Sequence, residues 1–106
     1  MEARFDELIH QPTRLRLTAL LYGLGPDARA EFGWLRRELA TTDGNLSVHL
    51  QKLEQAGYVR IDKEFVGRRP RTWVALTEQG RQAVRQHLQA LEALARAARG
   101  RRPRRP

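Results

Sequence analysis

The chain has 106 residues, 41% of them hydrophobic and 30% charged, a composition that predicts one folded soluble domain. It contains no cysteine, which excludes disulfides, thiolate metal sites and cysteine nucleophiles. The formal net charge is +8, but six arginines and no acidic residue lie between positions 96 and 106. The rest of the chain carries 14 basic and 12 acidic side chains, so charge alone is weak evidence for a nucleic-acid partner.

The N-terminal residues Met1–Asp6 lack the apolar core and the cleavage pattern of a signal peptide. No apolar run approaches the length that a membrane-spanning helix requires. We therefore expect a cytoplasmic protein without a membrane partner.

The first half of the chain predicts three helices and one short strand. Residues 4–10 favour a first helix, because their apolar side chains fall on one face. A second helix is expected to begin near Pro12, whose missing N–H costs nothing in a first turn, and to end at the glycines and proline of 23–26. Residues 28–32 predict a short strand, and residues 34–40 a third helix.

The second half of the chain begins with a helix and a hairpin. A fourth helix is expected over 43–56, and Gly57 supplies the stop that ends it. The period then changes from helical to alternating, which predicts strands at about 58–62 and 72–76. The segment 66–71 between them is basic and rich in turn-forming residues, so it is expected to be the tip of a hairpin.

A long helix over 78–99 is expected to end the folded part, with Thr77 as its N-cap. Residues 100–106 combine two prolines with four arginines and are expected to form a disordered basic tail. The predicted fold is therefore mainly α with a small β-hairpin (α+β, order α-α-β-α-α-β-β-α), in one domain over 1–99. Two short helices joined by a tight turn and followed by a basic hairpin are the layout of a winged helix-turn-helix.

The helix over 43–56 separates an apolar face from a polar one. Leu46, Leu50 and Leu53 recur at intervals of four and three residues and define the buried face. A DNA recognition helix needs this division, because leucines anchor it to the core while small or polar groups face the major groove. The residues expected to contact DNA from this helix and its cap are Thr42, Gly44, Asn45, Ser47, Val48, His49, Gln51 and Lys52.

The outward side chains are suited to different contacts. Asn45 and Gln51 can read adenine edges, and Val48 can meet a thymine methyl group. Lys52 can reach guanine or a phosphate, whereas His49 lies nearer the core flank and suits a phosphate or packing role.

Gly44 costs up to about 1 kcal/mol relative to alanine inside a helix. Together with the small Ser47, it is placed where the backbone could approach a phosphate at the positive end of the helix. The alternative is an ordinary solvated helix start.

Arg68, Arg69 and Arg71 lie on the proline-containing hairpin tip, with no acidic residue among them. They are placed to contact a neighbouring phosphate or to enter a minor groove. The alternative is a charged edge that keeps the hairpin soluble.

From about residue 6 to residue 84, the chain resembles winged-helix transcriptional regulators related to the ArsR and MarR families. The resemblance lies in Thr42-Asp43-Gly44-Asn45-Leu46-Ser47, Glu54-x-Ala56-Gly57-Tyr58-Val59, Lys63-x-Phe65-x-Gly67-x-x-Pro70-x-Thr72 and Leu76-Thr77-x-x-Gly80, and in the opening Ile9-His10-x-Pro12-x-Arg14-Leu15. It implies a homodimer that binds a palindromic operator in double-stranded DNA, usually as a repressor, with the helix over 43–56 facing the DNA.

Other functional classes are less well supported. Many ArsR-type proteins sense metals through cysteines, and this chain has only His10, His49 and His87, far apart in sequence, so neither a metal nor a cofactor is predicted. An enzyme is not expected, because no phosphate-binding glycine loop, catalytic triad spacing or paired carboxylates are present. The alternative function is a winged-helix module for protein or RNA contact, against which stands the polar face beside a basic hairpin.

Apolar residues recur along 78–99 at intervals of three and four, the pattern of a helix that pairs with a symmetry mate. Packing on its own domain would explain the first half of that pattern equally well, but beyond Leu91 few partners remain. The predicted dimer interface consists of Phe5, Leu8, Ile9, Val84, Leu88, Leu91, Leu94, Ala95 and Ala98. The arginine tail either adds phosphate contacts or serves solubility.

Overall fold

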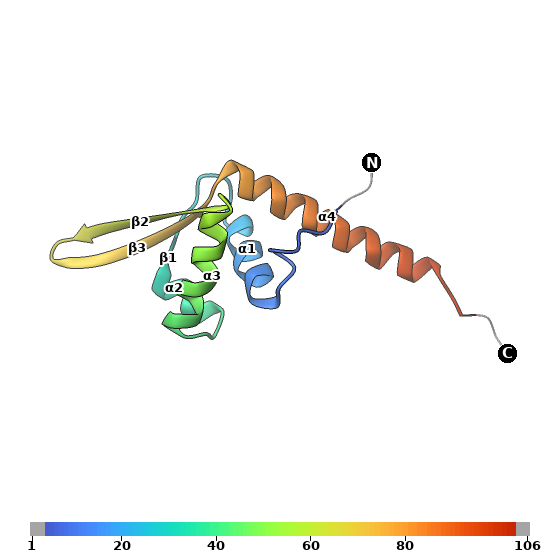
Figure 1. Cartoon of the computed structure of the whole chain (residues 1–106), viewed down its shortest axis with the longest axis horizontal. Helices are drawn as coiled ribbons and strands as arrows, with labels where there is room; N and C mark the ends of the chain where they lie inside the picture. Colours follow the sequence, from blue (N-terminus) through green and yellow to red (C-terminus); the bar gives the residue numbers. More distant parts are fainter. Residues whose placement is uncertain (1–3, 104–106) are drawn as a thin grey trace.

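The computed structural model describes residues 4–103. The elements follow the order α1 (Pro12–Gly23), β1 (Ala30–Glu31), α2 (Phe32–Glu38), α3 (Asp43–Gln55), β2 (Val59–Val66), β3 (Arg69–Leu76) and α4 (Glu78–Gly100). The β2–β3 hairpin and the second half of α4 project from the central body in opposite directions (Figure 1). The predicted α+β architecture is confirmed, with differences at its first helix and at its hairpin.

The predicted first helix over 4–10 is wrong, because this segment forms a single turn. The Asp6 carboxylate accepts the backbone N–H groups two and three residues further on, at 2.9 and 3.1 Å. The turn cannot continue into α1, since Pro12 disfavours helical backbone in the residue before it and Gln11 is extended, with φ −115° and ψ 134°. Gln11 instead caps α1.

The hairpin is longer and its turn tighter than the sequence predicted. Cross-strand pairs run from Val59 opposite Leu76 out to Val66 opposite Arg69, so most of the predicted tip over 66–71 belongs to strands. The turn is at Gly67, whose φ of +65° suits the first position of a two-residue turn. The remaining strand, β1, has two residues instead of the predicted five. It pairs with β3, so the order of strands in the sheet is β1-β3-β2.

Helix α3 is anchored as predicted. Leu46 and Leu53 are completely buried and Leu50 is 2% exposed. They pack in one core with residues of α1, α2 and the sheet: Leu17, Leu21, Ala30, Leu35, Leu39, Val59 and Val74. Gly57 ends α3 with a φ of +80° in a Schellman arrangement, in which the Tyr58 N–H donates to the Leu53 carbonyl.

Helix α4 is fixed to the body by close contacts in its first half. A Cβ on Gly80 would lie 2.0 Å from the carbonyl oxygen of Tyr58, so only glycine fits there. His87 is completely buried; its Nδ1 accepts the Asp6 N–H at 2.9 Å, and its Nε2 lies 3.2 Å from Nδ1 of His10. Two of the three histidines that the sequence placed far apart are therefore in contact.

Asp6 joins this turn to the sheet as well as to α4. The Tyr58 hydroxyl donates to the Asp6 carboxylate, which raises the pKa of Tyr58 to about 12.

Within residues 4–103, no three potential metal-ligating side chains lie close enough together to form a metal site. In the same range, no helix combines the length and hydropathy needed to cross a bilayer.

We expect acid to destabilise the fold through His87. Burial lowers the pKa of His87 and nearby His10 lowers it further, whereas Asp6 and Glu7 oppose the shift. The unfolded chain, in which histidine titrates near 6.5, therefore binds protons more readily than the folded chain. Neutral His87 therefore makes its full contribution to the free energy of unfolding above about pH 6.5, and this contribution is lost as the pH falls below that value.

The measurement is the melting temperature of wild type and His87→Gln between about pH 8 and about pH 5. Glutamine keeps an amide oxygen for the Asp6 N–H and an amide N–H for His10, but it does not titrate. The wild-type melting temperature should fall more steeply on acidification than that of the variant. Parallel curves would contradict the assignment.

Candidate nucleic-acid interface

Helices α2 and α3 form a helix-turn-helix. The turn between them places Ala40 at a φ of +49°, and the Thr41 N–H closes it by donating to the Arg36 carbonyl at 3.2 Å. The Thr42 hydroxyl accepts the Asn45 N–H at 3.1 Å and so caps α3. Thr42 therefore already has a structural role at the position where the sequence predicted a DNA contact.

The outward face of α3 carries the side chains that the sequence predicted. Gly44, Asn45, Ser47, Gln51 and Lys52 are exposed, as is Val48 with 51% of its surface. His49 is half-buried, and its Nδ1 lies 3.1 Å from Nη1 of Arg14 on α1.

An open groove of about 670 Å³ separates α3 from the hairpin. Ser47 and Gln51 line it from α3, and Lys63 and Thr72 line it from β2 and β3. Lys63 and Thr72 were not predicted from the sequence as DNA-contact residues. Strand alternation could have found both, because they share a face with the core residue Val74 and its cross-strand partner Ile61.

The arginines of the hairpin differ in their surroundings. Arg71 donates to Glu31 at 2.6 Å and thereby ties the hairpin to β1. On the same side of the hairpin, Arg29 pairs with Glu64 at 2.8 Å and covers the Trp73 ring at 4.3 Å. Arg68 and Arg69 are exposed at the tip, where no ion pair engages them among the described residues.

The far end of the hairpin also exposes an apolar surface that the sequence analysis did not single out. Phe65 is 77% exposed and Val66 53% exposed. Phe65 lies opposite Pro70 on the face that continues from Lys63 and Thr72. The tip therefore presents an aromatic ring beside arginines rather than arginines alone.

The residues predicted for the dimer interface fall into two groups. Ile9 and Val84 are completely buried inside the protomer, so they belong to its core and cannot form a surface. Phe5 is 42% exposed, and its ring centroid lies 5.4 Å from that of His10. Leu8, Leu88 and Leu91 are half-buried, whereas Leu94, Ala95 and Ala98 are exposed on the projecting half of α4.

A helix-turn-helix followed by a hairpin beside its second helix defines the winged-helix class of DNA-binding domains. The chain belongs to the winged helix DNA-binding domain family, whose model matches residues 13–95. This is a family of DNA-binding transcription-regulator domains and not of enzymes.

The chain is also similar to three known proteins in sequence or in fold. An uncharacterized protein of Methanocaldococcus jannaschii is 37% identical over 82 residues, 77% of this chain and 86% of that protein. The transcriptional regulator homologue protein of Pyrococcus horikoshii OT3 superimposes with a TM-score of 0.78 at 30% identity, covering 88% of this chain and 89% of that one. A protein of Enterococcus faecalis V583 described as a MarR-family transcriptional regulator shares the fold, with a TM-score of 0.68, 24% identity and coverage of 88% and 80%.

We expect Gly44→Ala to stabilise the protein and to weaken DNA binding. A Cβ at Gly44 would meet nothing within 4 Å, so alanine should add about 0.5–1 kcal/mol to the free energy of unfolding. In the predicted complex, the added methyl group would stand where the backbone approaches a phosphate.

Urea unfolding measures the first effect and titration of duplex DNA measures the second. Gly100→Ala is the matched control, since a Cβ there also meets nothing within 4 Å and the residue ends α4, far from α3. An unchanged DNA affinity for Gly44→Ala would show that no phosphate approaches the helix start.

Proposed function

We propose that this protein is a sequence-specific transcription regulator that binds a palindromic operator as a homodimer. In this proposal, α3 enters the major groove and the β2–β3 hairpin contacts the backbone or the adjacent minor groove. The observation that carries the proposal is the division of α3 into a buried leucine row and an exposed polar face beside a basic hairpin. Action as a repressor is proposed from the resemblance to ArsR and MarR regulators alone.

The surface chemistry of α3 supports a duplex as the ligand. Asn45 and Gln51 offer amides for base edges, and Val48 offers an apolar contact for a thymine methyl group. A protein-binding groove would instead expose clustered aromatic or aliphatic anchors on this face. An RNA platform would expose stacking aromatic rings there.

On the hairpin, the proposal assigns the DNA contacts mainly to Arg68, Arg69 and Lys63. Arg71 was also predicted from the sequence, but its pairing with Glu31 leaves it less available than its neighbours. Phe65 adds an apolar group of the kind that can wedge against sugars or bases in a minor groove.

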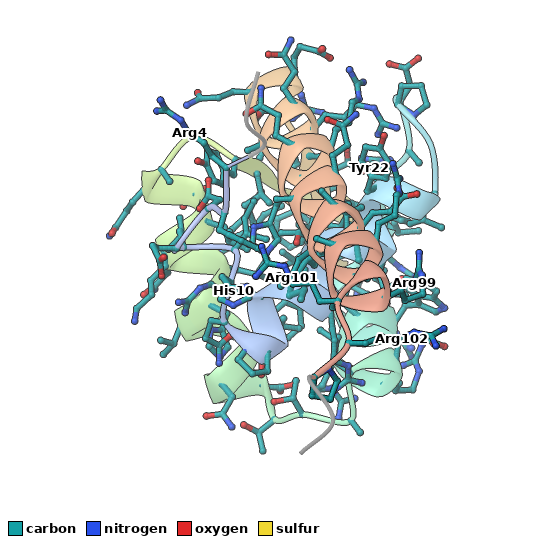
Figure 2. All side chains as sticks on the ribbon, turned by 90° about the vertical axis from the view of Figure 1, so that its right-hand side faces the viewer. Arg4, His10, Tyr22, Arg99, Arg101 and Arg102 are labelled. Carbon is teal, nitrogen blue, oxygen red and sulfur yellow. The ribbon has the colours of Figure 1, made fainter. Side chains whose placement is uncertain are left out.

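The second half of α4 supports the homodimer. The buried stripe of its first half continues in sequence as Leu91, Leu94, Ala95 and Ala98. This half of α4 leaves the body of the protomer (Figure 1) and comes toward the viewer in Figure 2, where Arg99 marks its last turn. An isolated helix end is marginally stable in water, and a second copy would cover this stripe. Two recognition helices could then lie about 34 Å apart, one turn of B-DNA.

Substitutions on α3 and the hairpin should have different effects on DNA binding. Asn45→Ala should cost roughly 1–3 kcal/mol on the selected site and much less on random duplex, because it removes a base contact. Arg69→Ala should weaken binding to every duplex and lower the slope of log affinity against log salt by about one, because it removes a phosphate contact.

Fluorescence anisotropy over a salt series measures both quantities, on a site first selected from random duplex DNA. Arg60→Ala is the matched control, because Arg60 is exposed but pairs with Asp62 at 3.0 Å on the stem of the hairpin. Equal losses for Asn45→Ala on all duplexes would remove base reading from the proposal. Preference of the wild type for single-stranded RNA would favour an RNA-interaction module instead.

The dimer is tested by placing a charge at one apolar position of the proposed interface. Leu94 is 57% exposed on the stripe, and Leu94→Asp should convert a dimer into a monomer without altering the protomer core. Gln89→Asp on the opposite side of the helix is the control and should remain dimeric. Sedimentation equilibrium gives the mass of each, and a monomeric wild type at tens of micromolar would contradict the homodimer.

A further inference from the structure

We infer that Arg14 is a positioning residue for DNA binding, which holds His49 as a neutral hydrogen-bond donor to a DNA phosphate at the edge of α3. The inference rests on the proposed placement of α3 against DNA. It concerns a residue of α1 that is itself outside the recognition helix.

Arg14 is held by two hydrogen bonds that use the fixed geometry of its guanidinium. Its Nε donates to the carbonyl oxygen of Leu8 at 2.6 Å, and its Nη1 lies 3.1 Å from Nδ1 of His49. Because the guanidinium is planar, a donor fixed at Nε also fixes the direction of Nη1. The side chain is half-buried and links the N-terminal turn to His49 of α3, which lies 35 positions after Arg14 in the sequence.

The contact determines which nitrogen of His49 carries the proton. An arginine side chain can only donate, so Nδ1 of His49 must accept. A neutral imidazole that accepts at Nδ1 carries its hydrogen on Nε2. Arg14 therefore selects the Nε2–H form of the ring.

The charge of His49 follows from the same surroundings. Burial lowers the pKa of His49, and the positive charges of Arg14 on α1 and Lys52 on α3 lower it further. The ring is therefore neutral at neutral pH. It presents one N–H donor of known position instead of a positive charge.

The donor is available to a ligand. Within residues 4–103, Nε2 of His49 has no hydrogen-bond partner in the protein and is not among the buried unpaired atoms. His49 follows Asn45 by one helical turn and precedes Lys52 by three residues, so it lies between two residues of the proposed reading face. A neutral donor there adds a phosphate contact without releasing a counterion, whereas Lys52 adds one with release.

The free protein tests the hydrogen bond without DNA. Nitrogen-15 NMR of the imidazole should show Nε2 protonated and Nδ1 unprotonated at neutral pH in the wild type. Arg14→Lys keeps the positive charge but not the planar pair of donors, so it should shift His49 towards the Nδ1–H form. Arg16→Lys, an exposed position on the same helix, should leave the His49 signals unchanged. An unshifted His49 in Arg14→Lys would overturn the inference.

DNA binding tests the role of the donor. His49→Ala should weaken binding about three- to tenfold, the loss of one net hydrogen bond, with an unchanged salt slope. His49→Gln, whose amide N–H can stand in for Nε2–H, should stay within about twofold of the wild type. Arg14→Lys alone should weaken binding by about the same factor as His49→Ala. Added to His49→Ala, it should weaken binding by less than about a further twofold, because the two residues act through one contact.

The double variant separates positioning from a general structural effect. If Arg14→Lys weakens binding equally with His49 present or absent, Arg14 does not act through His49 and the inference is overturned. It is likewise overturned if His49→Ala binds as tightly as the wild type. A wild type that binds no duplex at all would instead contradict the proposed function, while the NMR result would still report on the Arg14–His49 contact.

Discussion

The burial of Leu46, Leu50 and Leu53 is the constraint on which the proposed DNA-facing surface depends. Fully burying a leucine contributes about 1.5–3 kcal/mol, and all three lie on one row of α3 in contact with the core. Rotating the helix would expose these side chains to water and bury the amides of Asn45 and Gln51 without hydrogen-bond partners, and both changes are unfavourable. The leucine row therefore fixes the rotation of α3, and with it the polar face that the protein presents.

A second constraint is the turn that precedes α1, and it connects parts of the molecule that have different proposed roles. Asp6 contacts α4 through His87 and contacts Tyr58, the residue directly before β2. The carbonyl of Leu8, in the same turn, holds Arg14, which in turn contacts His49 on α3. The N-terminal turn and Arg14 thus connect the proposed dimerisation helix to the proposed recognition helix through named hydrogen bonds.

Local patterns allowed much of this structure to be predicted from the sequence. The bounds of α3 agree within one residue, because Thr42 and Gly57 are local signals for its start and stop. The helix expected over 4–10 failed because Asp6 offered the backbone a competing side-chain acceptor and Pro12 prevented continuation. The contact between Arg14 and His49 could not be predicted, since nothing local to either residue specifies the other.

The hairpin shows why residue type alone is insufficient evidence for a contact. Arg69 and Arg71 are equally basic and lie two residues apart on β3, but only Arg71 has Glu31 within reach, because β1 pairs with the stem of the hairpin and not with its tip. The ion pair with Glu31 that fixes the stem makes Arg71 less available to a phosphate. Arg69 at the tip lies beyond the end of β1 and has no such ion pair within the described part of the chain. Stability at the stem and availability at the tip thus follow from the same two-residue length of β1.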